Sequence, residues 1–219
     1  MFPLRDDRPT YTAPIVTVLL IAACVLVFFF ELSLDEYSRD YFINLYGVVP
    51  AHLRPSALMT SLFIHGGWAH IIGNMLFLWA FGRSLEDGMG HVKFLIFYLI
   101  SGLAAGIAFA LFNPGSTLPT VGASGAIAGV MGGYLVKFPR ARVVTLVPIF
   151  FFLTTVDIPA AFLLLYWFAM QFFNGVGSVG DSQASRGDVA WFAHIGGFLA
   201  GMGLVMLLAP RQPRYQQWQ

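Results

Sequence analysis

One hydroxyl and one imidazole in apolar parts of this 219-residue chain are of types suited to acyl transfer. Ser124 lies in the glycine-rich segment 120–133, and His194 lies in the apolar run 189–209. A serine hydroxyl becomes a good nucleophile when a base takes its proton, and a neutral imidazole is suited to that task. The pair therefore predicts attack by Ser124 on a carbonyl carbon, with His194 as the general base.

Two further polar side chains, His70 and Asn74, could stabilise the negative charge that such an attack creates. They are four positions apart, so in a helix they project from one face. Both can donate hydrogen bonds to an oxyanion, and the free amides of a helix that opens near Ser124 would add to them. We expect all three sources of hydrogen bonds to serve the same oxyanion.

The composition indicates that membrane helices must position these residues. Hydrophobic side chains make up 58% of the chain, charged ones 11%, and the mean hydropathy is +0.73, which leaves too little polar surface for a soluble globule. We therefore predict an all-α membrane protein in which residues 1–219 form a single domain. Runs close to the length of a membrane helix predict six spans, at residues 14–30, 68–81, 94–112, 121–138, 159–173 and 189–209.

Positive charge predicts the orientation of these spans. A six-span arrangement collects nine of the lysines and arginines on one side, namely Arg5, Arg8, Arg83, Lys93, Lys137, Arg140, Arg142, Arg211 and Arg214. Only Arg39, Arg54 and Arg186 fall on the other side. Since positive loops face the cytoplasm, both termini are expected there.

A seventh span at 143–156 is the alternative reading of the same pattern. It would move the last two arginines outside, it is only 14 residues long, and it contains Pro148. We therefore expect 143–156 to be a loop that lies on the membrane surface.

The six-span arrangement brings the polar residues to one depth. Three spans begin on the outer side, and His70, Ser124 and His194 are the third, fourth and sixth residues of these spans. At about 1.5 Å of rise per residue they fall within roughly 10 Å of depth of one another. Any one of them is explained by a hydrogen bond between helices. Because polar groups in a membrane are costly unless they face a cavity or each other, the whole set predicts a catalytic site in a water-containing cavity open to the outer side.

Glycines predict which helices touch. Gly125, Gly129 and Gly133 recur at every fourth residue, and Gly197 and Gly201 lie on one face of the last span. Strips without side chains allow two helix backbones to approach closely. We therefore expect the fourth and sixth spans to be in contact, which a short serine side chain needs to reach an imidazole on another helix.

Three short motifs surround the polar residues, namely His70-Ile-Ile-Gly-Asn74, Gly122-Ala123-Ser124-Gly125 and Ala193-His194-Ile195-Gly196-Gly197. Together they resemble the rhomboid family of intramembrane serine proteases. The resemblance covers nearly the whole chain. It implies a six-helix bundle, a Ser-His dyad without a third acidic member, no metal and no cofactor. It also implies cleavage of the transmembrane segments of other proteins near the outer membrane face.

The resemblance assigns roles to individual residues. It makes Ser124 the nucleophile, His194 the base, His70 and Asn74 the oxyanion donors, Gly122 and Ala123 parts of the turn that presents the serine, and Glu86 a structural acid after the second span. Two positions depart from the family. Leu53-Arg54 stands where members often have Trp-Arg, which leaves the anchoring of the outer loop open. Ala128 stands where some members carry a tyrosine that stacks on the base, so other neighbours must orient His194.

Other classes of function fit the sequence less well. A net charge of +1 offers no basic face for nucleic acid. His65 and His70 are spaced by five without the glutamate of a zinc protease, and the spans hold no pair of carboxylates for an aspartyl protease. The alternative kept is a non-catalytic, rhomboid-like binder of membrane helices or a transporter. A binder is expected to lack Ser124 or His194, and a transporter to show broken helices and charges at the membrane midplane.

The resemblance implies that the partners are transmembrane protein substrates with weakly helical segments. The lipid bilayer is the other expected partner, and the expected location is a bacterial inner membrane. Residues 172–188, which include the glycine-rich stretch 175–180, are expected to form a mobile cap that admits water and substrate.

Overall fold

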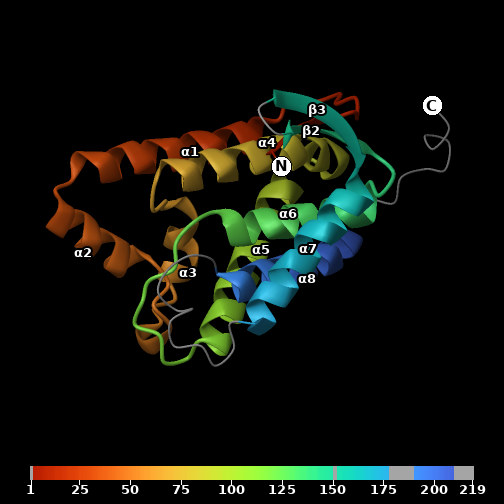
Figure 1. The fold of residues 1–219 in the computed structure, drawn as a ribbon. Helices are drawn as coiled ribbons and strands as arrows, with labels where there is room; N and C mark the ends of the chain where they lie inside the picture. Colours follow the sequence, from red (N-terminus) through yellow and green to blue (C-terminus); the bar gives the residue numbers. More distant parts are fainter. Residues whose placement is uncertain (1, 150–151, 178–189, 210–219) are drawn as a thin grey trace.

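The computed structural model describes residues 2–149, 152–177 and 190–209, which fold as a helical bundle with a small sheet at one end (Figure 1). Within these residues, four helices are long and apolar enough to cross a membrane: α1 (Ile15–Ser33), α5 (His91–Phe112), α7 (Ala160–Gly177) and α8 (Trp191–Leu208). Two further predicted spans coincide with α4 (Trp68–Met89) and the shorter α6 (Ser124–Lys137). The chain is therefore a mostly helical membrane protein, as the composition predicts, and the count of six spans stays a prediction.

Two helices differ in extent from the predicted membrane spans. The second helix does not end at residue 81 but continues to Met89, before Gly90 with a φ of 83°. The fourth helix begins at Ser124 and not at residue 121. Its start is delayed by Gly122, which has a φ of 122°, a backbone conformation that an α-helix cannot contain. Ser124 is therefore the first residue of its helix.

The prediction of a surface loop at 143–156 is also wrong. That region contains β2 (Arg142–Ile149) and β3 (Phe152–Pro159), which pair in antiparallel register, and β1 (Phe2–Asp6) pairs antiparallel with β2. Valine and threonine are abundant in β2 and β3, and such β-branched residues favour strands. A strand from the start of the chain completes the sheet.

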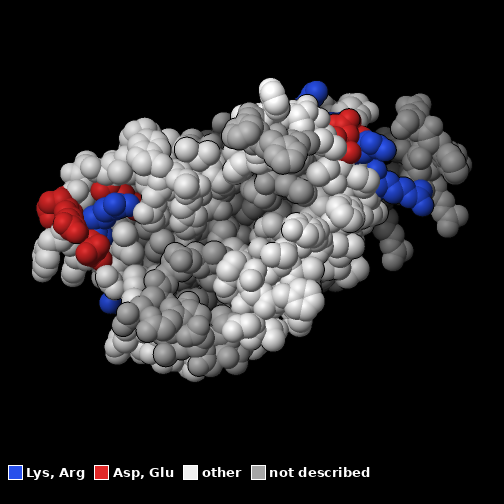
Figure 2. Space-filling view, in the orientation of Figure 1, with Lys and Arg blue, Asp and Glu red and all other residues white. Residues whose placement is uncertain are grey.

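The long connection between α1 and α4 contains only short helices, as its prolines predict. They are α2 (Glu36–Tyr46), a 3₁₀ turn at Pro50–His52, α3 (Ala57–Thr60) and a second 3₁₀ turn at Ser61–Phe63. In Figure 1, α2 and α3 lie at the end of the bundle opposite the sheet. Figure 2 shows charged side chains gathered at these two ends, with a broad middle that has no Lys, Arg, Asp or Glu on the described part of this face. Such a band suits the hydrocarbon core of a bilayer.

The central element of the bundle is α6. Every residue from Gly125 to Leu135 is buried, in contact with α4, α5, α7 and α8. By contrast, outward-facing side chains of α1 such as Leu19 and Leu26 are exposed. In Figure 1, α4, α6 and α8 run in one direction, so their N-terminal ends share one end of the bundle. This arrangement brings residues from three helix starts to one place.

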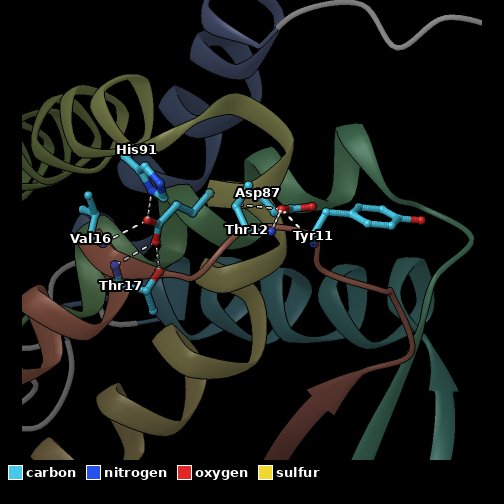
Figure 3. A network of polar contacts seen from close by, with 7 residues as sticks. Tyr11, Thr12, Val16, Thr17, Asp87 and His91 are labelled. Atoms are coloured by element: carbon cyan, nitrogen blue, oxygen red, sulfur yellow. Dashed lines mark hydrogen bonds and ion pairs between the residues drawn. The ribbon is translucent and has the colours of Figure 1, made fainter.

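A buried carboxylate joins α4 to the start of α1 (Figure 3). Glu86 accepts hydrogen bonds from the backbone amides of Val16 (2.9 Å) and Thr17 (2.8 Å) and from the Thr17 hydroxyl (2.7 Å). Nδ1 of His91 lies 2.6 Å from the same carboxylate. Helix-start amides need acceptors, and negative charge is stabilising there. Glu86 lies inside α4, which continues beyond residue 81, where the predicted span ends.

The segment before α1 is tied to the same end of the bundle. Asp87 accepts a bond of 2.7 Å from the Thr12 hydroxyl (Figure 3). Asp6, the last residue of β1, accepts from the Tyr134 hydroxyl of α6 at 2.6 Å and pairs with Arg83 of α4 at 3.0 Å. The N-terminal strand therefore holds together the ends of α4 and α6 that lie away from Ser124.

Candidate active site

The turn before α6 places the Ser124 side chain at a helix start. Gly122 has a positive φ, and its amide donates to the carbonyl of Ser61 at 2.9 Å. Ala123 is fully buried and precedes the first helical residue. Ser124 therefore lies beside the unsatisfied amides of the first turn of α6, where the helix dipole favours negative charge.

His194 meets Ser124 from the neighbouring helix. It is the fourth residue of α8, it is buried, and its Nε2 lies 2.8 Å from the Ser124 Oγ. Its other nitrogen, Nδ1, lies 2.7 Å from Oε1 of Gln171 on α7. An amide oxygen can only accept, so Nδ1 carries the proton of the neutral imidazole. Nε2 is then free to accept the proton of the serine hydroxyl, as a general base must.

The predicted contact between the fourth and sixth helices is confirmed, although the glycines act differently from the prediction. A side chain at Gly197 or Gly201 of α8 would collide with the backbone carbonyl of Gly125 or Gly129 of α6. The space beside Gly125 and Gly129 themselves is filled mainly by α5, with Ala105 next to the first. The glycines of α8 therefore allow the close approach of α6. The glycines of α6 mainly make room for side chains of α5.

His70 and Asn74 converge on the turn that precedes Ser124. A Cβ at Gly122 would lie 2.6 Å from Nε2 of His70 and 3.6 Å from Nδ2 of Asn74. Asn74 is buried, and its Nδ2 has no hydrogen-bond partner among the described residues. A buried donor without a partner is costly, and such groups are often explained by a function. The structure thus brings all of the sequence-predicted site residues together, while their chemical roles stay predictions.

A second histidine, His65, lies behind His70 at a ring-centroid distance of 5.2 Å. It lies just before the start of α4 and is fully buried, and its backbone amide donates to Oε1 of Glu31 at 3.1 Å. Burial lowers the pKa of His65 to about 4, so the ring is neutral at pH 7.

No group of three His, Cys, Asp or Glu side chains within the described ranges could hold a metal ion.

Sequence reasoning missed Gln171. This side chain is buried on α7 against His194, and a lone amide within the predicted span 159–173 was the available signal. That span runs opposite to the ones that carry Ser124 and His194, so a residue near its C-terminal end reaches their level. Of the predicted cap at 172–188, residues 172–177 are the last turns of α7, and residues 178–188 lie outside the described ranges.

Comparison with known proteins shows which family and which proteins this chain is similar to. Residues 52–211 match the Rhomboid domain family. The chain is 33% identical over 159 residues to RHOMBOID-like protein 6, mitochondrial, of Arabidopsis thaliana, a match that covers 70% of this chain and 44% of that protein. It is 32% identical over 136 residues to rhomboid protease GluP of Bacillus subtilis, which covers 60% of this chain and 25% of GluP.

A third similar protein, YdcA of Bacillus subtilis, is 33% identical over 139 residues, and the match covers 62% of this chain and 69% of YdcA. The chain thus matches less than half of the length of RHOMBOID-like protein 6 and of GluP, and most of YdcA. The family match includes all of the candidate site residues, which lie on α4, α6 and α8 and in the turn before α6.

Proposed function

Because this chain belongs to the rhomboid family of membrane proteins, we propose that it is a serine-type intramembrane endopeptidase in which Ser124 and His194 form the catalytic dyad. The observation that carries the proposal is the 2.8 Å contact between the Ser124 Oγ and Nε2 of a buried His194. The unpartnered Nδ2 of Asn74 beside the same turn supports an oxyanion site.

Peptide cleavage would proceed in two acyl-transfer steps. The Ser124 Oγ attacks the carbonyl carbon of the scissile peptide bond while Nε2 of His194 takes the hydroxyl proton. Asn74, His70 and the amides at the start of α6 donate hydrogen bonds to the resulting oxyanion. The C–N bond then breaks, and His194 gives its proton to the leaving amine.

An ester between Ser124 and the N-terminal part of the substrate remains. His194 takes a proton from a water molecule, whose oxygen attacks the ester carbonyl through a second oxyanion. The C–O bond to Ser124 breaks, the serine regains its proton from His194, and the carboxylic acid product leaves. Hydrolysis at this depth needs water at Ser124, so a cavity open to the outer side is part of the proposal.

The proposed arrangement in the membrane has six spans, α1, α4, α5, α6, α7 and α8, in one domain with both termini in the cytoplasm. The excess of lysine and arginine on one side supports this orientation. The substrates would be transmembrane segments of other proteins, cut near the outer face of a bacterial inner membrane. Weakly helical segments are favoured because the dyad must meet an extended peptide bond.

The alternative is a non-catalytic protein that binds membrane helices or transports a solute. The contact between Ser124 and His194 and the unpartnered amide of Asn74 favour the enzyme, because neither is needed for helix binding. Among the described residues, the six bundle helices are continuous, which gives no support to the broken helices of a transporter.

A serine-directed fluorophosphonate probe tests the proposal. Wild-type protein in liposomes should be labelled at Ser124, as located by mass spectrometry, and Ser124→Ala should not be labelled. Ser84→Ala is the matched control, because Ser84 is a buried serine toward the other end of α4, and it should be labelled like wild type. Liposomes that also hold single-span proteins with glycine or proline in the membrane segment should yield two fragments with wild type only. If wild type is neither labelled nor cleaves any of them, the protease proposal is wrong.

A further inference from the structure

The proposed base is held by α7 as well as by Ser124. Oε1 of Gln171 lies 2.7 Å from Nδ1 of His194, and the ring of Trp167 lies 5.6 Å from the imidazole, measured between centroids, at an angle of 38°. Trp167 and Gln171 are four residues apart on α7, so they face His194 from one side of that helix. Gln171 contacts the edge of the imidazole, and Trp167 lies against its ring.

We propose that Gln171 is a positioning residue that completes the Ser124–His194 pair as an uncharged third member. This inference rests on the proposed function. A neutral imidazole has two tautomers, and only the one protonated at Nδ1 leaves Nε2 free to take the serine proton. Because the amide oxygen of Gln171 accepts from Nδ1–H, it favours that tautomer and fixes the rotation of the ring toward Ser124.

The surroundings of His194 give this contact weight. Both Gln171 and His194 are at least nine-tenths buried, with exposed fractions of 7% and 8%, so loss of the hydrogen bond would leave a buried N–H without that acceptor. One turn beyond Ser124 on α6, Ala128 is fully buried and offers only a methyl group. In this chain the imidazole ring of His194 is therefore oriented by Gln171 and Trp167 of α7.

An uncharged third member has a recognisable effect on the dependence of the rate on pH. The base must be neutral to act, and a carboxylate in place of the amide would favour the protonated imidazolium. Gln171→Glu should therefore move the acidic limb of the profile of kcat/KM against pH toward higher pH. Gln171→Met, which keeps the length of the side chain but has no such acceptor, should move it toward lower pH.

The test compares wild type, Gln171→Met, Gln171→Glu and Asn174→Ala in liposomes. Asn174 is the matched control, because it is an exposed amide on α7 that donates to the carbonyl of Met170 and not to His194. We expect Gln171→Met to lower kcat about 10- to 100-fold with little change in KM, as for loss of one buried hydrogen bond. Gln171→Glu should stay within about tenfold of wild type at its shifted optimum, and Asn174→Ala should match wild type.

A second measurement does not depend on activity. In protein labelled with ¹⁵N-histidine, the His194 signals, assigned by their loss in His194→Gln, should show a proton on Nδ1 in wild type. In Gln171→Met the share of that tautomer should fall. Gln171→Glu should retain the proton on Nδ1. The NMR measurement on that variant keeps the inference testable even if Gln171→Met has low thermal stability.

The outcomes separate the two proposals. If Ser124→Ala abolishes cleavage but Gln171→Met keeps wild-type kcat, pH profile and tautomer, the role of Gln171 is wrong and the protease proposal stands. If wild type does not cleave or react with the probe, the protease proposal fails, and the tautomer in Gln171→Met still decides whether the glutamine positions the ring.

Discussion

Ser124 and His194 are 70 positions apart in the chain, yet their side chains meet at 2.8 Å across the contact of α6 and α8. Because the two residues lie on separate helices, the distance between their side chains is set by how closely α6 and α8 pack. Gly197 and Gly201 allow that approach, since their side-chain positions lie over the backbone of α6. The proposed chemistry therefore depends on helix packing as much as on the reacting groups.

Removal of either dyad member should have the effect of removing both. We expect Ser124→Ala and His194→Ala each to lower kcat at least about 10³-fold, because the nucleophile and its base act as a unit. The double variant should be no slower than the slower single variant, as measured by cleavage of a reporter protein in liposomes. Two independent, multiplying losses would contradict a dyad.

Asn74→Ala should separate activity from stability. We expect kcat to fall about 10²- to 10³-fold, as for loss of one oxyanion donor. Because Nδ2 of Asn74 has no partner in the described structure, its removal should leave the free energy of unfolding unchanged or higher. Reporter cleavage and reversible unfolding in detergent measure the two quantities. A variant that is much less stable but fully active would show a structural role instead.

A methyl group added to α8 should disturb the site only where α6 is close. Gly201→Ala places a Cβ against the backbone of Gly129, which should cost about 1–3 kcal/mol of unfolding free energy and displace His194 enough to lower kcat. Gly203→Ala on the same helix is the control, because no described atom other than those of its chain neighbours and the nearby backbone of α8 lies within 4 Å of its Cβ position. Equal thermal stability and activity in the two variants would argue against the packing account.

Glu86→Gln should weaken the attachment of α1. The neutral amide has one acceptor oxygen where the carboxylate accepts from two backbone amides and a hydroxyl, and its NH₂ group would face donors. We expect a loss of about 3 kcal/mol in unfolding free energy, measured by reversible unfolding in detergent. Asp87→Asn, at a partly exposed position, should lose less than about 1 kcal/mol. An equal loss in both variants would disprove the special role of the buried carboxylate.

His65 should make stability depend on pH. Burial lowers its pKa from 6.5 to about 4, so between these values the unfolded chain binds a proton that the folded chain does not. This contribution to stability is present above pH 6.5, falls as the pH drops toward 4, and changes little below. His65→Gln should therefore show a shallower loss of unfolding free energy between pH 6.5 and pH 4 than wild type. If the unfolding free energies of the two proteins fall in parallel with pH, His65 does not cause the pH dependence of stability.

Hydropathy predicts where the bundle helices lie, but local backbone geometry decides where they begin. The pattern of apolar residues continues through Gly122, so the sequence predicts a helix start at residue 121, whereas a φ of 122° at that glycine moves it to Ser124. Strands β2 and β3 are apolar enough to be taken for a membrane-surface loop. The other partner of β2 is β1, a long-range pairing that no local pattern reveals.

The polar members of the site could be predicted because serine, histidine and asparagine are rare at one level of a membrane bundle. Gln171 belongs to the same level, but its relation to His194 depends on the rotation and tilt of α7, which hydropathy does not give. The same holds for the α6 glycines. Their spacing predicts a close neighbour, while only the packed structure identifies α5 as the main one.

Strand β1 has a consequence for the order of assembly. Residues 2–6 leave the ribosome long before their hydrogen-bonding partners in β2, and the contact of Asp7 with Arg142 joins positions 135 apart. Strand β1 can therefore pair with β2 only after α1, α4, α5 and α6 have been synthesised. Closure of the sheet can therefore report that the helices between have reached their final arrangement.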